Sequence, residues 1–171
     1  MGSLRDIIKK PKIKGTKKMK KIIVGVMIVS SMLFGGIVHE EKNYSYLDKI
    51  PKKELAQELT KELVKNLNLP LKLDKITVLQ NIFAYDDDIL LLKTLDDDNY
   101  KIKEIMNNKK IKQIFIKKML IADSQHFCND SIWSYLINKR NIIPEINYYN
   151  RKGKLLFKYT IEPSDCEKVK H

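Results

Sequence analysis

The chain has 171 residues, enough for one hydrophobic core, and carries 33 basic against 21 acidic residues, a formal net charge of +12. Residues 1–21 hold nine basic residues and one acid, which leaves 24 basic and 20 acidic residues for the rest of the chain. No aromatic residue lies between the lysines of this tail, so the sequence does not indicate a nucleic-acid partner. Repeats, a phosphate loop, a serine elbow and a metal motif are absent from the sequence, which excludes the common signatures of catalysis.

Residues 22–38 form an apolar run without a charge. As a helix this run is about 26 Å long, just under the thickness of about 30 Å of the hydrocarbon core of a bilayer. We therefore predict a transmembrane helix that contacts membrane lipid. Acidic residues follow the run, and basic residues precede it, which marks its N-terminal end as cytoplasmic. The basic residues nearest the run are predicted to contact the membrane surface: Lys17, Lys18, Lys20 and Lys21. We therefore expect a single-pass protein of the inner (cytoplasmic) membrane, with a cytoplasmic tail at 1–21.

A cleaved export signal beginning at Met19 is the alternative. Its cleavage site would need Gly35 or Gly36, and these follow bulky residues. No cysteine follows the run directly, so a lipoprotein is not expected. The flanks favour the uncleaved anchor, and the tail is then either a solvated topology signal or a lipid-binding segment.

After a polar linker at 39–50, we expect one domain over 51–171. Pro51 suits the start of a helix that continues to about Asn66. Its predicted apolar face consists of Leu55, Ala56, Leu59, Leu63 and Val64.

From Leu71 the apolar period changes to two, which predicts a strand. Ile76, Val78, Ile82 and Ala84 are predicted to fall on one side of this strand, which Gln80 and Asn81 interrupt. Asp86, Asp87 and Asp88 then predict a hairpin turn before a second strand at 89–95.

A second acidic triplet, 96–98, precedes a helix in which Ile102, Ile105 and Met106 share a face, and aspartate there suits a helix start. Both triplets invite a metal or paired-carboxylate hypothesis. Neither has the alternating ligands, glycine and distal glutamate of a calcium loop, so turn and cap chemistry is favoured, and no metal or cofactor is expected.

A longer helix should follow Asn108 and end near Ser124, and a short helix capped by Asn129 or Asp130 should end by Asn141. The predicted apolar face of the longer helix contains Ile111, Ile114, Phe115, Met119 and Ala122. Trp133 in the short helix is interpreted as a core anchor rather than a ligand platform.

The chain closes with a predicted hairpin around a turn at 150–153, with Gly153 in the left-handed conformation. Pro144 should lie at a sheet edge or outside the ladder. Ile146 and Tyr148 precede the turn, and after it Leu155, Phe157, Tyr159 and Ile161 alternate with Leu156, Lys158, Thr160 and Glu162.

Cys128 and Cys166 are the only cysteines, and the expected orientation places both outside the cytoplasm, so we predict a disulfide between them. A Cys128 nucleophile with His126 as its base is disfavoured because residues two apart seldom face each other. A zinc site of His126, Cys128 and Cys166 lacks a clear fourth ligand.

The C-terminal part resembles a group of small bacterial envelope proteins of uncharacterised function. The resemblance is carried by Cys128, Ile146, Asn147, Tyr148, Tyr149, Asn150, Gly153, Leu156, Ile161, Asp165 and Cys166. It implies an exported location and the same disulfide, and it implies no catalytic residues.

The sequence thus predicts an α+β domain with an antiparallel sheet of two hairpins packed against helices. We interpret it as a non-catalytic interaction module of the envelope, of an accessory, immunity or exclusion type, with a protein partner and no identified small-molecule substrate. A secreted or periplasmic hydrolase or redox enzyme with a cleaved signal is the alternative.

Overall fold

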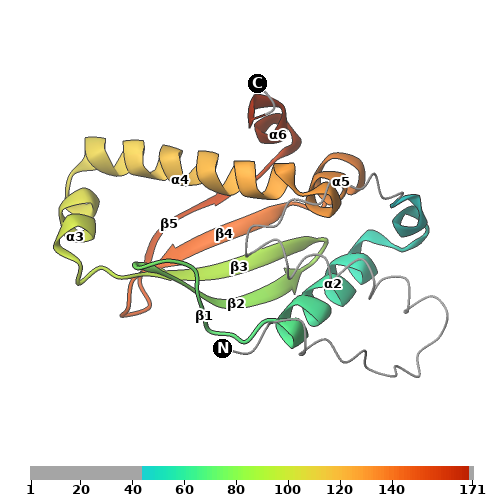
Figure 1. The fold of residues 1–171 in the computed structure, drawn as a ribbon, viewed down its shortest axis with the longest axis horizontal. Coiled ribbons are helices and arrows are strands. Elements are labelled where there is room, and N and C mark those ends of the chain that lie inside the picture. Colours follow the sequence, from blue (N-terminus) through green and yellow to red (C-terminus); the bar gives the residue numbers. More distant parts are fainter. Residues whose placement is uncertain (1–43, 170–171) are drawn as a thin grey trace, which may run out of the picture.

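The computed structural model describes residues 44–169. Within this range, no helix combines the length and apolar character that a bilayer crossing requires. The predicted span at 22–38 and the basic tail before it lie outside the described residues. The elements are η2 (Ser45–Lys49), α2 (Lys52–Asn66), β1 (Leu71–Lys72), β2 (Thr77–Tyr85), β3 (Asp88–Leu95), α3 (Tyr100–Asn107), α4 (Lys109–Asn129), α5 (Ser131–Arg140), β4 (Pro144–Tyr149), β5 (Leu155–Thr160) and α6 (Pro163–Val169) (Figure 1).

The strands form one mixed sheet in the order β1-β2-β3-β4-β5. The α+β class and the two hairpins are confirmed, but the prediction of a wholly antiparallel sheet is wrong because β3 and β4 are parallel. Three helices connect β3 to β4, and this long crossover returns the chain to the end of the sheet at which β3 began. Pro144 is the first residue of β4, a central strand, and not at an edge as predicted. A first position tolerates proline because only its carbonyl is needed, and that carbonyl accepts a hydrogen bond from the Ile161 N–H at 3.0 Å.

One face of the sheet packs against the helices. Along β3, buried and half-buried residues alternate strictly, as a half-covered sheet requires. The buried side chains of β3 belong to the same core as Leu55 of α2 and Leu136 of α5, whereas Leu90 and Leu92 point to the opposite face. We call that opposite face of β2 to β5 the open sheet face.

Two bulges alter which residues face the core. In β2 the register shifts between Leu79 and Asn81, so Leu79 is buried and Val78 turns outward, against the prediction for Val78. In β5 the extra residue is Leu156, so Leu155 pairs with Tyr149 on the open sheet face. Leu155 is 44% exposed and does not share the side of Phe157 and Tyr159, so the predicted alternation is wrong at this residue.

The helices begin at side-chain caps. Asn99, Asn108 and Asp130 accept hydrogen bonds from the first free N–H groups of α3, α4 and α5. The cap of α3 is thus Asn99 and not an aspartate of the preceding triplet. The predicted cap Asp130 accepts from the N–H groups of Ile132 and Trp133 at 3.0 and 2.9 Å.

The length of α4 exceeds the prediction, because the helix continues past Ser124 to Asn129. Its predicted apolar face is also partly wrong. Phe115 and Met119 pack on the core, but Ile111, Ile114 and Ala122 are exposed. The covering face is rotated toward Ile116, Leu120, Phe127 and Cys128.

In α2 the predicted face is buried except for Val64, which is 40% exposed. Trp133 lies in the core, with its ring edge-on to Phe127 at 4.8 Å between centroids. The turn of the second hairpin is as predicted, with Gly153 at φ 75°.

Candidate functional site

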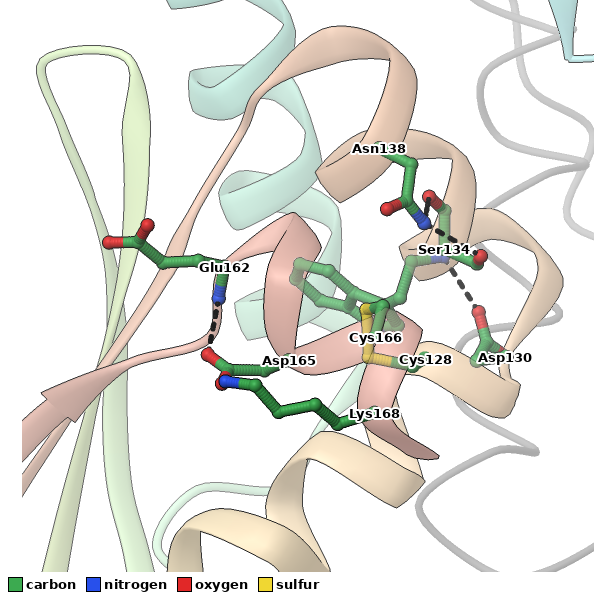
Figure 2. The surroundings of a disulfide bond; sticks show 9 residues. Cys128, Asp130, Ser134, Asn138, Glu162, Asp165, Cys166 and Lys168 are labelled. Carbon is green, nitrogen blue, oxygen red and sulfur yellow. Dashed lines mark hydrogen bonds and ion pairs between the residues drawn. A yellow bond between two sulfur atoms is a disulfide. The ribbon is translucent and has the colours of Figure 1, made fainter. Parts of the chain in front are cut away.

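The disulfide joins the end of α4 to the C-terminal helix. Cys128 lies in the last turn of α4 and Cys166 in α6, with their Cα atoms 5.2 Å apart and 38 positions between them in sequence. Figure 2 shows the bond beside Asp165, whose carboxylate accepts from the Glu162 N–H at 3.1 Å and pairs with Lys168 at 3.0 Å. Cys128 is therefore not a free nucleophile, and the pairing fixes α6 against the helical layer.

The acidic triplets are used for structure. Asp86 and Asp87 form the two-residue turn between β2 and β3, and Asp88 accepts a hydrogen bond from the Ile143 N–H at 2.9 Å. Among residues 44–169, no cluster of histidine, cysteine and carboxylate side chains is arranged to hold a metal ion.

Arg151, in the turn between β4 and β5, binds the second triplet. The guanidinium of Arg151 lies 3.1 Å from Asp96 and 2.9 Å from Asp98. The backbone N–H of Arg151 donates to Asp97 at 3.2 Å. That N–H lowers the pKa of the Asp97 carboxyl below its ordinary value. The triplet thereby joins the loop after β3 to the second hairpin.

A buried polar cluster, formed by Lys93, Asp123, Tyr148 and Tyr159, lies between the sheet and α4. The ammonium of Lys93 donates to both carboxylate oxygens of Asp123, at 3.0 and 2.9 Å, and to the hydroxyl of Tyr148 at 3.2 Å. Asp123 Oδ2 also accepts from Tyr148 at 3.0 Å and from Tyr159 at 2.7 Å. Every proton of the ammonium has an acceptor, so the cluster is a satisfied network.

The environment of this cluster keeps its phenols protonated. Burial, followed by the negative charge of Asp123, raises the pKa of Tyr148 and Tyr159 well above the ordinary tyrosine value. Lys93 and Asp123 form an ion pair at 2.9 Å, and their side chains are only 7% and 18% exposed. The cluster fixes α4 against β3, β4 and β5 and offers no free acid or base.

The sequence patterns did not predict this cluster, although two features of the sequence indicate it. Lys93 stands in phase with Leu91 and Leu95, the buried side of β3. Asp123 is the one acidic residue in the 21 residues of α4. A lysine at a buried strand position needs a carboxylate partner, and Asp123 was the available acid on the long helix.

A hollow of about 460 Å³ lies between α3, α4 and the turn after β4. Its volume falls in the range of small-molecule sites, but charged side chains dominate its lining, unlike the apolar walls of most ligand pockets. The charged residues are Asp97, Asp98, Lys103, Lys112, Lys152 and Lys154. The hollow is therefore a poor candidate for a substrate site.

On the open sheet face, several apolar side chains of the described domain point away from the core. Phe83 is 43% exposed and pairs with Leu90, and in the next row Leu92 pairs with Asn147. The Asn147 amide oxygen is buried in this face and has no hydrogen-bond partner among residues 44–169. Tyr85, 70% exposed, stands at the end of β2. Phe83, Leu90 and Leu92, with the unpaired acceptor of Asn147 directly opposite Leu92, make this face the best candidate site for a partner.

No protein-family model matches the chain, and no curated protein sequence matches it. The fold is nevertheless similar to solved structures. The pilotin EpsS of the Vibrio vulnificus type 2 secretion system superposes with a TM-score of 0.52 at 13% identity, over 67% of this chain and 91% of the pilotin. The type II secretion pilotin AspS from Vibrio cholerae gives 0.51 at 16% identity, over 67% and 92%.

A Pseudomonas aeruginosa protein described as secreted gives a TM-score of 0.52 at 9% identity, over 67% of this chain and 96% of that protein. At these identities the similarity shows a shared fold. The described domain therefore has the fold of pilotins and of a protein described as secreted.

Proposed function

We propose that this protein is a non-catalytic, membrane-anchored interaction protein of the bacterial envelope, whose domain lies outside the cytoplasm and binds a protein partner. The observation that carries the proposal is the open sheet face, which presents Phe83, Leu90 and Leu92 and, directly opposite Leu92, the unpaired acceptor of Asn147. Exposed apolar patches with a few unsatisfied polar groups are typical of protein-binding sites.

The disulfide supports the location. Disulfides persist in oxidising compartments, and Cys128–Cys166 is buried beside the core. The fold shared with two secretion-system pilotins supports an accessory role in an envelope assembly. The apolar run at 22–38 supplies the anchor in this proposal.

The internal pairing of the charged groups supports a binding role over a hydrolytic one. Lys93 is occupied by Asp123, and Arg151 is occupied by the triplet at 96–98. The partner is then recognised by apolar contact and by a donor that reaches Asn147.

The test is partner capture from native membranes with variants of matched exposure. Phe83→Asp changes the open sheet face, and Val64→Asp changes a 40% exposed residue on the outer side of α2. We expect F83D to lose the co-purified partner and V64D to retain it, with both variants keeping the disulfide and the wild-type thermal midpoint. Equal retention by both variants would remove the open sheet face from the proposal. A photo-crosslinking residue at 83 should label the same partner.

A further inference from the structure

The outer side of α4 combines isoleucine with lysine and carries no acid. Ile111, Ile114 and Ile121 are 40%, 51% and 43% exposed. The lysines on the same side are also exposed: Lys110, Lys117 and Lys118. We call these six residues the α4 ridge.

The one acid of α4 does not face this ridge. Asp123 points to the sheet, where it is held by Lys93 and two tyrosines. Apart from Gln113, the exposed residues of the helix from Lys110 to Ile121, about 17 Å along the axis, are basic or apolar. A basic amphipathic helix surface of this kind is typical of helices that lie on anionic membranes.

The position of Tyr44 brings α4 close to the proposed membrane anchor. The Tyr44 hydroxyl is 2.8 Å from the Ser131 hydroxyl, and Ser131 begins α5 directly after the Asp130 cap that ends α4. The Tyr44 ring also contacts Tyr135 at 5.7 Å between centroids. The first described residue therefore lies at the C-terminal end of α4.

This step rests on the proposed function, in which residues 22–38 span the membrane. Only residues 39–43 then separate the span from Tyr44, a distance of at most about 22 Å when fully extended. Figure 1 shows α4 lying along the length of the sheet, with α5 and α6 at its C-terminal end. One end of α4 is thus tethered near the membrane surface, and its outer side is free to lie along that surface.

We propose that the α4 ridge docks on the anionic surface of the membrane that anchors the chain. The three isoleucines enter the headgroup region, and the three lysines pair with lipid phosphates. A flat membrane suits this surface better than an acidic protein helix, because the ridge is the convex side of a single helix and no second element forms a groove with it among the described residues.

The experiment uses the full chain in lipid nanodiscs of phosphatidylglycerol or of phosphatidylcholine, with nitroxide-labelled lipid as a fluorescence quencher. Ile114→Trp reports on the ridge. Phe83→Trp, at a residue of similar exposure on the open sheet face, is the matched control. The buried Trp133 contributes the same background to both variants. We expect quenching of I114W in phosphatidylglycerol nanodiscs, weak quenching in phosphatidylcholine, and none of F83W in either.

Charge reversal tests the electrostatic part. K117E/K118E in the I114W background should lower the docked-to-undocked ratio by more than about 30-fold. The loss of each basic residue near an anionic leaflet removes roughly a fivefold preference, and each new glutamate adds repulsion. K61E/K65E reverses two exposed lysines of α2 and should leave the quenching unchanged. A thermal midpoint equal to that of I114W and an intact disulfide show that each variant is folded.

The inference is overturned if I114W is not quenched although the chain is embedded in phosphatidylglycerol nanodiscs. The same result is expected if the ridge binds a protein instead. Quenching of F83W shows that the opposite face meets the membrane and overturns it as well. A chain that does not enter nanodiscs contradicts the proposed anchor rather than the ridge. In that case the same quenching, measured on chain added to phosphatidylglycerol vesicles, tests the ridge alone.

Discussion

The ammonium of Lys93, in the middle of β3, lies 2.9 Å from the carboxylate of Asp123, the one acidic residue of α4. The two residues are 30 positions apart in sequence, and their contact fixes the long helix over the sheet. Replacing one member leaves a charge in a nearly closed site, which costs more than the pair contributes.

We therefore expect Lys93→Met and Asp123→Leu each to lower the free energy of unfolding by roughly 3 kcal/mol, and the double variant to lose less than either single variant. Urea unfolding followed by Trp133 fluorescence measures both. The exposed Lys158–Glu145 pair, at 3.2 Å, is the control, and Lys158→Met should cost less than about 1 kcal/mol. Additive losses at positions 93 and 123 would contradict this view of the cluster.

Replacing either cysteine should lower the free energy of unfolding by as much as replacing both. Cys128→Ser, Cys166→Ser and the double variant should each lose about 4 kcal/mol on the chain-entropy estimate, because one substitution already opens the 38-residue loop. Thermal unfolding compares the three. Thiol labelling of the unreduced, denatured wild type should find no free thiol, and labelling of both cysteines would reopen the cytoplasmic and metal-site interpretations.

Asp130 should give the domain a pH dependence. Burial is the main cause that raises its pKa to about 6 from an ordinary value of 3.8, and the hydrogen bonds from Trp133 and Ile132 oppose the shift. The folded pKa lies above the unfolded one, so the stabilising contribution is complete below about pH 4 and is lost as the pH rises through 6.

In Asp130→Asn the cap remains and this titration disappears. In the wild type, Asp130 should lower the free energy of unfolding by on the order of 2 kcal/mol between pH 4 and pH 6, and the variant should lack this loss. Urea unfolding at half-unit pH steps measures the slope. Asn108→Ala removes an uncharged cap of α4 and should lower stability by about 1 kcal/mol at every pH. An unchanged slope in D130N would assign the decline to another group.

Gly153 tests the second hairpin. Its φ of 75° is strained for residues with a side chain, and a Cβ built there meets no atom within 4 Å. Gly153→Ala should therefore cost about 1 kcal/mol through backbone strain alone, and Gly153→Asn should cost less because asparagine tolerates this conformation. Thermal midpoints rank the two variants, and Lys154→Ala, at the exposed next residue, should match the wild type.

Topology is tested on whole cells. Protease added to spheroplasts should remove residues 42–171 because the basic tail remains in the cytoplasm, whereas a cytoplasmic control protein stays intact. The protein should also keep its N-terminal tail and resist alkaline extraction. A soluble chain that begins near Gly36 or Ile37 would select the cleaved-signal alternative.

The sequence by itself determined the local elements of this protein. Apolar period, turn residues and capping residues predicted α2, α3, α4, α5 and the two hairpins, with Asn129 or Asp130 as the cap of α5, because these features depend on neighbours a few positions apart. The continuation of α4 past Ser124 and the helix α6 were not predicted. The cysteine count and the expected compartment also predicted the pair that the structure joins, Cys128 and Cys166.

Tertiary structure alone decided how these elements combine. The parallel pairing of β3 with β4, the bulges at Gln80 and Leu156, and the partner of Lys93 all join residues that are distant in sequence or shift the register by one position. The open sheet face and the α4 ridge both result from such long-range packing. A one-residue bulge turned Leu155 outward, and the rotation of α4 left Ile111 and Ile114 exposed, because the side of an element that faces the core is set by what packs against it and not by its own pattern.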